Sequence, residues 1–183
     1  MGKLAVSQFV SVDGVIEDPV GMESLGRGDW TSAGSFGDEG NEFVHAQIRA
    51  ADAFLMGRRT YEGYVAAWPE RDGAYADKLN AMPKYVVSST LSEPPWSNTS
   101  VIGLDEVRAL KERHAETMIH GSAQLTDALI AQGLIDEWRL IVFPVIVGKG
   151  KRLFGDPGHA VNLRLTDSRK VGDGVQILVY APA

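Results

Sequence analysis

The sequence has no cysteine, and this absence removes a whole group of chemistries. Without thiols the chain can form no disulfide, no thiolate metal site and no cysteine nucleophile. Long apolar runs are missing as well, because no stretch approaches the roughly 20 residues that a membrane-spanning helix needs. The first residues reach polar Gln8 too early for a signal peptide. We therefore expect a cytoplasmic protein without a membrane span.

Basic residues are too few for a general nucleic-acid binder. The chain has 18 Lys and Arg against 24 Asp and Glu, a formal net charge of −6, whereas such binders usually carry a basic face. The histidines are dispersed, with no pair at metal-ligand spacing, so we expect no metal site. A small anionic ligand held by local arginines stays compatible with this charge.

Three sequence fingerprints of well-known α/β enzymes are also missing. No G-x-G-x-x-G follows a strand, and no G-x-x-x-x-G-K-[ST] occurs, which argues against a Rossmann dehydrogenase and a P-loop enzyme. No G-x-S-x-G elbow occurs either, which argues against an α/β-hydrolase.

The chain does contain a short apolar run that leads into a helix through a glycine and two arginines. Phe54-Leu55-Met56 predicts a strand, Gly57-Arg58-Arg59-Thr60 follows, and Tyr61 and Tyr64 continue at helical spacing. Glycine lets the backbone turn sharply, and Thr60 is an acceptable N-cap. This pattern predicts an anion site at a helix N-terminus. The alternative is that Gly57 merely ends the strand and the arginines are solvated.

Two further strands end in a similar way. Ser88-Ser89-Thr90 follows a strand that begins at Lys84, and Gly121-Ser122-Ala123 follows a strand that ends at His120. Ligands of open α/β sheets bind at the carboxyl ends of the strands. The three exits together therefore predict a site for a molecule that bears several phosphates.

The alternation of short strands and helices predicts an α/β fold. Helices are expected from residue 38, after Thr60, near residues 75–82, after Asp105 as a cap, and over residues 125–132. The apolar run 138–147 suits a strand that is covered on both faces. Gly172-Asp173-Gly174 between two alternating runs predicts an antiparallel hairpin. With neither repeats nor linkers, we expect one domain over residues 1–183.

Residues 17–40 form a polar, glycine-rich segment. A structureless loop of this length in a compact domain is usually functional or disordered. Trp30 and Phe36 within it favour an ordered lid or a partner contact, and a loosely packed surface excursion is the alternative.

In the order of these elements and motifs, the chain resembles the dihydrofolate reductase family. More closely, it resembles the stand-alone proteins related to the reductase (C-terminal) domain of the bifunctional riboflavin biosynthesis deaminase-reductase. The likeness covers nearly the whole chain. Its anchors are Ser11-Val12-Asp13-Gly14, the run from Leu55 to Glu62, the run from Lys84 to Leu91, Ile119-His120-Gly121-Ser122, the run from Pro144 to Gly150, and Leu153-Phe154. The resemblance implies a three-layer α/β/α fold with a mixed, mostly parallel sheet and a C-terminal antiparallel hairpin.

The resemblance also implies NADPH as the hydride donor. It places the pyrophosphate between the turn at Gly57 and the second helix start near Gly121, and the 2′-phosphate of the adenosine near Ser88. The cofactor-binding residues that it implies are Val15, Ile16, Gly57, Arg58, Arg59, Thr60, Ser88, Ser89, Thr90, Gly121, Ser122, Ala123, Gln124 and Leu125.

Two carboxylates are the candidates for catalysis. Dihydrofolate reductases place a carboxylate on the first helix, and counting back from Gly57 selects Glu42. The alternative is a solvated glutamate in the first helical turn, which the helix dipole favours. Asp13 fits the family's Asp-Gly motif, but it is equally a turn residue. Trp68 is a candidate wall of the substrate pocket or a core residue.

The function predicted from the sequence is an NADPH-dependent reductase of a small heterocycle. A 5-amino-6-(5-phosphoribosylamino)uracil-type pyrimidine and a pterin are the substrates implied by the resemblance, and the 17–40 segment departs from both relatives. A non-catalytic nucleotide- or metabolite-binding protein and an α/β phosphosugar enzyme are the alternatives. Residues 138–147 and the C-terminal hairpin could supply the surface of a homodimer, although core burial would explain them equally well.

Overall fold

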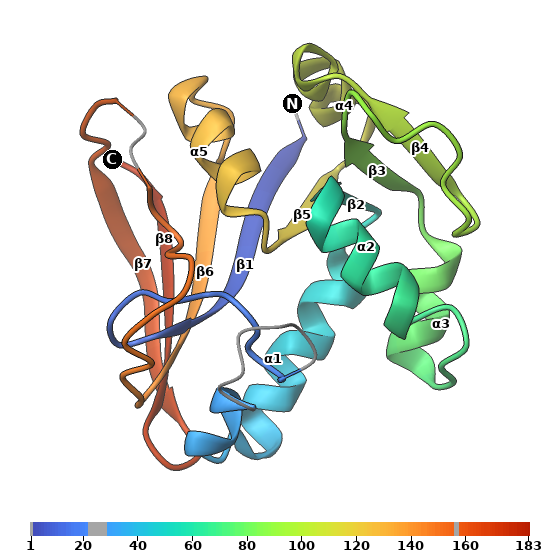
Figure 1. The fold of residues 1–183 in the computed structure, drawn as a ribbon. Coiled ribbons are helices and arrows are strands. Elements are labelled where there is room, and N and C mark those ends of the chain that lie inside the picture. Colours follow the sequence, from blue (N-terminus) through green and yellow to red (C-terminus); the bar gives the residue numbers. More distant parts are fainter. Residues whose placement is uncertain (1, 22–28, 156–157) are drawn as a thin grey trace.

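The computed structural model describes residues 2–21, 29–155 and 158–183. Its centre is one eight-stranded sheet of order β4-β3-β2-β5-β1-β6-β8-β7 (Figure 1). The strands are β1 (Lys3–Ser11), β2 (Ala53–Gly57), β3 (Lys84–Val87), β4 (Thr99–Ile102), β5 (Glu116–His120), β6 (Glu137–Phe143), β7 (Leu163–Val171) and β8 (Val175–Pro182).

Five strand pairs are parallel and only those made by β8 are antiparallel. Strand β8 pairs with β6 on one side and with β7 on the other, so the end of the chain forms the expected hairpin. The predicted mixed, mostly parallel sheet with a C-terminal antiparallel hairpin is confirmed.

Helices cover both faces of the sheet. They are α1 (Gly37–Ala50), α2 (Arg58–Ala67), α3 (Ala74–Ala81), α4 (Val107–Arg113) and α5 (Ala123–Ala131), with 3₁₀ turns η1 (Trp30–Ala33) and η2 (Leu104–Glu106). Successive strand residues point to opposite faces, so Leu55 packs in one core cluster with α4 and α5, while Phe54 and Met56 pack in another with α1, α2 and α3. The three-layer arrangement is thereby confirmed.

Three local predictions differ from the structure. Strand β6 ends at Phe143 rather than continuing to residue 147, because Pro144 has no N–H to donate to the ladder. Asp105 lies inside η2, and the N-cap of α4 is Glu106. The N-cap of α2 is Gly57, so Thr60 belongs to the first turn of the helix rather than preceding it.

The described ends of the glycine-rich segment pack against the sheet. Trp30 is 5% exposed, its Nε1 donates to the Glu17 carbonyl over 2.9 Å, and its ring meets the edge of Phe143. Phe36 makes an edge contact with Phe9. Both aromatic residues are therefore part of the packed structure, while residues 22–28, the middle of the predicted lid, lie outside the described residues.

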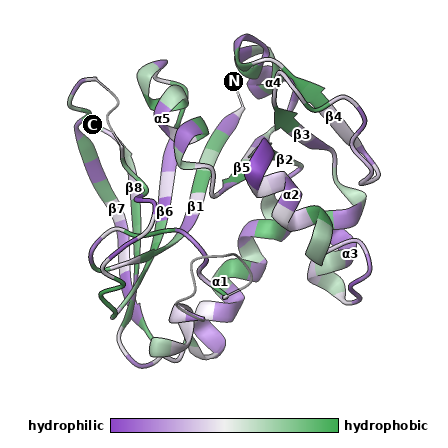
Figure 2. Cartoon of the chain, viewed as in Figure 1, coloured by the Kyte–Doolittle hydropathy of each residue, from purple (hydrophilic) through white to green (hydrophobic). Residues whose placement is uncertain are grey.

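Within the described ranges no helix is both long and apolar enough to cross a membrane. Coloured by hydropathy, the most hydrophilic part of α2 is its beginning, next to the more hydrophobic strands (Figure 2). This is the turn that carries Arg58 and Arg59.

Candidate functional site

The three strand exits meet in one groove. Strands β3, β2 and β5 are neighbours in parallel, so their carboxyl ends lie at the same edge of the sheet. The groove has a volume of about 1700 Å³ and is lined by residues of all three exits. This volume exceeds the ~300–1,000 Å³ of a pocket for one drug-sized ligand, so the groove has room for two small molecules side by side.

The beginning of α2 is held by the hydroxyl of Ser122. The Gly57 N–H donates to Ser122 Oγ over 2.8 Å, and Thr60 Oγ1 lies 2.7 Å from the same oxygen. A Cβ on Gly57 would lie 2.8 Å from Ser122 Oγ, which is too close for a real side chain. A side chain at this position would force Ser122 to shift, so glycine permits the close approach of the two turns.

The beginning of α5 faces the same groove. Gly121 and Ser122 have φ values of +60° and +64°, which turn the chain from β5 into the helix. The Gly121 N–H donates to Gln8 Oε1 over 2.7 Å and ties this turn to β1. The groove therefore receives two helix N-termini, each with first-turn N–H groups and the positive end of a helix dipole.

Hydroxyl groups after β3 complete this half of the groove. Ser88 Oγ accepts the N–H groups of Thr90 and Leu91, which folds the exit into a tight turn. Arg58 Nη1 donates to Thr90 Oγ1 over 2.6 Å, and its Nε donates to Glu62 over 2.8 Å. The guanidinium is thus positioned between α2 and the β3 exit. Such an arrangement of cations, hydroxyls and helix ends is suited to phosphate groups.

The opposite half of the groove is lined by ring side chains. Tyr64 of α2 and Trp68, the C-cap of that helix, stack with centroids 6.1 Å apart, and Tyr75 of α3 lies 5.1 Å from Trp68. Arg71 covers the Trp68 ring at 4.8 Å. Helix α1 contributes His45, whose ring lies 5.6 Å from Tyr75. This half is suited to stacking on a planar ring.

A hydrogen-bonded pair, His120 and Tyr64, also lines this half. The Tyr64 hydroxyl lies 2.8 Å from His120 Nδ1. Burial, with the charge of Arg139 as a smaller cause, lowers the pKa of His120 to about 4, and burial raises the pKa of Tyr64 well above its usual value. Both groups are therefore uncharged at neutral pH.

The structure brings nearly all the predicted cofactor-binding residues to the groove. Those that line it are Ile16, Gly57, Arg58, Arg59, Thr60, Ser88, Ser89, Thr90, Gly121, Ser122, Ala123, Gln124 and Leu125. Trp68 lines it as well. Val15 does not, because its side chain is fully buried in the core cluster around Phe143.

Neither predicted catalytic carboxylate lines the groove. Glu42 lies on the exposed side of α1 and pairs with Arg49, while Val44 and His45 are the residues of α1 that reach the groove. Asp13 accepts hydrogen bonds from Ser11 Oγ and from the N–H groups of Val147 and Gly148, which lower its carboxyl pKa to about 2. Its contacts are those of a residue that fixes two loops, and a catalytic role for either carboxylate stays a prediction.

Sequence reasoning missed the His120–Tyr64 pair. His120 directly precedes the glycine of a strand exit, so its position at the carboxyl end of β5 was readable from the sequence. Its partner is 56 residues away, and no local pattern joins the two.

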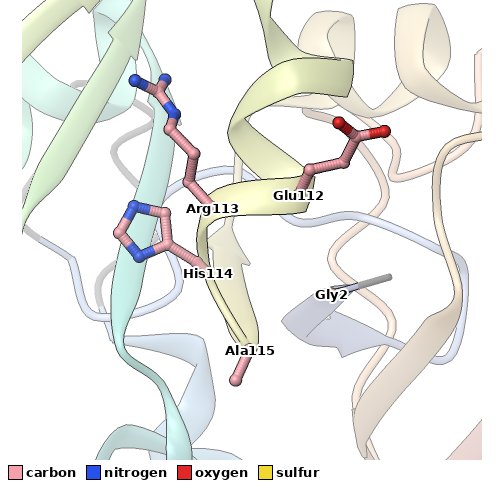
Figure 3. Close-up of a pocket in the computed structure, with 5 residues that line it drawn as sticks. All are labelled: Gly2, Glu112, Arg113, His114 and Ala115. Carbon is pink, nitrogen blue, oxygen red and sulfur yellow. The ribbon is translucent and has the colours of Figure 1, made fainter.

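A second hollow lies at the opposite edge of the sheet, at the amino ends of β1 and β5. It is lined by Gly2, Glu112, Arg113, His114 and Ala115 (Figure 3). None of the predicted site residues lies there. His, Asp and Glu side chains of the described residues form no group of three that could hold a metal ion.

Comparison with known proteins agrees with this architecture. The model of the RibD C-terminal domain family matches residues 3–177. The uncharacterized protein YyaP of Bacillus subtilis (strain 168) is 31% identical over 143 residues, which are 73% of this chain and 75% of that protein.

Solved structures show the same fold at low sequence identity. A Shewanella sp. PV-4 protein named for riboflavin biosynthesis has a TM-score of 0.80 and 22% identity, with 99% of both chains covered. The deaminase/5-amino-6-(5-phosphoribosylamino)uracil reductase of Thermotoga maritima has a TM-score of 0.66 and 17% identity. That match covers all of this chain and 57% of the larger protein.

Proposed function

This chain belongs to the RibD C-terminal domain family, and we propose that it is an NADPH-dependent reductase of a small heterocyclic substrate. A pyrimidine of the 5-amino-6-(5-phosphoribosylamino)uracil type or a pterin is the substrate class that we propose. The observation that carries the proposal is the groove, in which two helix N-termini and the hydroxyls of the β3 exit converge beside a half lined by rings.

The first turns of α2 and α5 and the exit of β3 form one half of the groove, which we call the phosphate half. Its residues fit NADPH. The first turns of α2 and α5 would hold the pyrophosphate between them through backbone N–H groups. Ser88, Ser89, Thr90 and Arg58 would hold the 2′-phosphate of the adenosine, and Arg59 adds a second cation on the same turn. Ile16 would form part of the wall of the nicotinamide site. NADPH, when bound, supplies the hydride, while the protein positions the two reactants and excludes water.

The contribution of Arg58 to cofactor choice provides the first test. Arg58→Gln removes a cation that Thr90 and Glu62 hold in place, so we expect about a tenfold loss of NADPH affinity, or ~1.4 kcal/mol. NADH lacks the 2′-phosphate, and its affinity should not change. Calorimetry, with the fluorescence of Trp30, Trp68, Trp96 and Trp138 as a second readout, measures both.

Arg164→Gln, an exposed arginine on β7, is the matched control and should bind both cofactors like the wild type. No saturable change with millimolar NADPH on the wild type would overturn the cofactor assignment. Equal losses for NADPH and NADH would overturn the role of Arg58.

Turnover is tested by following NADPH oxidation with a panel of pyrimidines and pterins. Oxidation that depends on one of them supports the reductase. NADPH binding without oxidation by any member of the panel would favour the non-catalytic nucleotide-binding protein instead.

We also propose that the chain forms a homodimer in the cytoplasm. Two large apolar side chains are exposed near the edge strand β7: Val161, which precedes the strand, is 39% exposed, and Leu165, within it, is 49% exposed. Covering them in a partner's surface would remove apolar area from water. Light scattering during gel filtration measures the assembly, and Leu165→Glu should shift a dimer towards the monomer.

A further inference from the structure

The ring-lined half of the groove is assembled from four separate elements. His45 comes from α1, Tyr64 from α2, Trp68 from the C-cap of α2, Tyr75 from α3, and His120 from β5. The Phe54 ring meets the His120 imidazole edge-on at 5.2 Å and fixes the plane of the imidazole. The polar groups of this half are therefore carried by side chains that are already held in place.

The hydrogen bond between Tyr64 and His120 determines which imidazole nitrogen is available. In the described part of the chain, this contact is the only hydrogen bond of either side chain. We assign the proton of this contact to the half-buried Tyr64 hydroxyl and make Nδ1, 2.8 Å away, its acceptor, because the hydroxyl has no other hydrogen-bond partner among the described residues. The proton of the neutral imidazole then resides on Nε2, which becomes a hydrogen-bond donor.

Among the described residues no charged side chain makes a hydrogen bond with this pair, and the charge of Arg139 acts on His120 only as the smaller cause of its lowered pKa. Among the described residues that line the groove, the carboxylates are Glu17, whose Oε1 pairs with Lys151 Nζ at 2.8 Å, and the exposed Asp72. The hydrogen bond and charge of Lys151 hold the pKa of Glu17 below its usual value. Helix α1 presents a histidine and a valine here and no carboxylate.

We infer that His120 is the specificity-determining residue of a hydride-acceptor subsite, where its Nε2–H binds a hydrogen-bond acceptor atom of an uncharged planar ring. Tyr64 is a positioning residue that acts through His120 by fixing the tautomer. The inference rests on the proposed function for the identity of this ring as the acceptor of the hydride.

The Nε2–H of His120 recognises hydrogen-bond acceptors on the ligand ring, whereas a carboxylate in its place would recognise donors. An ionised carboxylate only accepts hydrogen bonds and so recognises N–H groups, whereas an Nε2–H recognises a carbonyl oxygen or an unprotonated ring nitrogen. A ring that turns a donor towards His120 leaves two buried donors facing each other, at the cost of an unpaired polar group. The acceptor subsite therefore discriminates by the polarity of one ring atom.

Quinoxaline, whose ring nitrogens only accept, and indole, whose ring nitrogen only donates, are the probes. We expect the wild type to bind quinoxaline more tightly than indole in calorimetric titrations. His120→Phe keeps a ring but removes the donor, so quinoxaline should bind about tenfold more weakly, as for one lost hydrogen bond. Tyr64→Phe should weaken it by a smaller factor. The NADPH affinity of both variants should stay that of the wild type.

His114→Phe is the matched control, because His114 also bonds a tyrosine hydroxyl, that of Tyr85 at 3.0 Å, but lies in the remote hollow. It should bind quinoxaline normally. Nitrogen-15 NMR of the wild type provides a readout that needs no variant, since the inference expects His120 to be protonated at Nε2 and Tyr64→Phe to show both tautomers.

The outcomes separate this inference from the proposed function. A wild-type proton on Nδ1, no quinoxaline binding, or unchanged binding in His120→Phe would overturn the role of His120, whether or not NADPH binds. If NADPH fails to bind while His120→Phe still loses quinoxaline, the subsite stands and the proposed reductase fails.

Discussion

A single hydroxyl links the two turns that build the phosphate half of the groove. Ser122 Oγ accepts the Gly57 N–H and contacts the Thr60 hydroxyl, while the Ser122 carbonyl accepts the N–H of Thr126 in α5. Ser122 adopts this position with φ at +64°, a conformation that costs energy for a residue with a side chain. At the scale of the residue, the spacing between the two helix N-termini is therefore set by this one side chain.

Removing that hydroxyl provides the residue-scale prediction. Ser122→Ala leaves the Gly57 N–H without its acceptor, so we expect the free energy of unfolding to fall by about 1–2 kcal/mol. NADPH affinity should fall several-fold as the two turns separate. Urea unfolding and calorimetry measure the two effects, with Ser168→Ala on exposed β7 as the control. Unchanged NADPH affinity in Ser122→Ala would contradict this role.

At the scale of the element, the end of α3 depends on a buried ammonium group. Lys84 is 0% exposed, and its Nζ donates to the carbonyls of Leu79, Asn80 and Met82. The Nζ also lies 4.6 Å from the centroid of the Trp96 ring. Carbonyls at a helix C-terminus lack partners within the helix, and the first residue of β3 supplies them here. Burial lowers the pKa of Lys84 to about 8, which still leaves most of it charged at neutral pH.

Lys84→Met tests this cap. The apolar side chain fills the space but removes the ammonium donor from three carbonyls, of which only that of Asn80 keeps another donor, Asn98 Nδ2. We therefore expect the free energy of unfolding to fall by about 2–4 kcal/mol. Denaturant unfolding measures the change. Lys170→Met, at an exposed position of β7, should stay within about 0.5 kcal/mol of the wild type. A loss in Lys84→Met no larger than in this control would mean that water replaces the ammonium.

At the scale of the whole molecule, the neutral His120 links stability to pH. Its pKa in the folded protein is about 4, below the ordinary 6.5. Between these values the unfolded chain binds a proton that the folded chain does not, so acid favours unfolding. The contribution of the neutral imidazole is fully present above pH 6.5 and is lost as the pH falls towards 4.

His120→Gln should therefore flatten the stability curve between pH 6.5 and 4, as measured by urea unfolding at a series of pH values. Asp13→Asn should leave the part of this window above about pH 5 unchanged, because the Asp13 pKa is lowered from 3.8 to about 2 and its contribution is lost mainly in stronger acid. A wild-type and a His120→Gln curve that run parallel across the window would contradict a neutral His120 in the folded protein.

The alternation of strands and helices and the position of the phosphate half could be predicted from the sequence, for a local reason. Gly57, Gly121 and Ser88 each act within a few residues of a strand end, and parallel strands bring such ends to one edge. Apolar spacing likewise predicted the C-terminal hairpin. The single domain over residues 1–183 and the homodimer stay predictions.

Tertiary structure decided the composition of the ring-lined half of the groove. Successive side chains of a helix differ in direction by about 100°, so a small error in counting along the chain selects a different face. Counting selected Glu42, whereas the packing of α1 brings His45 to the groove and leaves Glu42 in solvent. Val15 is adjacent to Ile16 in sequence but points into the core. The pairing of Tyr64 with His120 depends on how α2 packs over β5, and a contact between residues 56 positions apart exists only in the folded chain. The sequence by itself determined which turns form the proposed phosphate half, because turns are local, and only the fold decided which side chains line the ring-lined half.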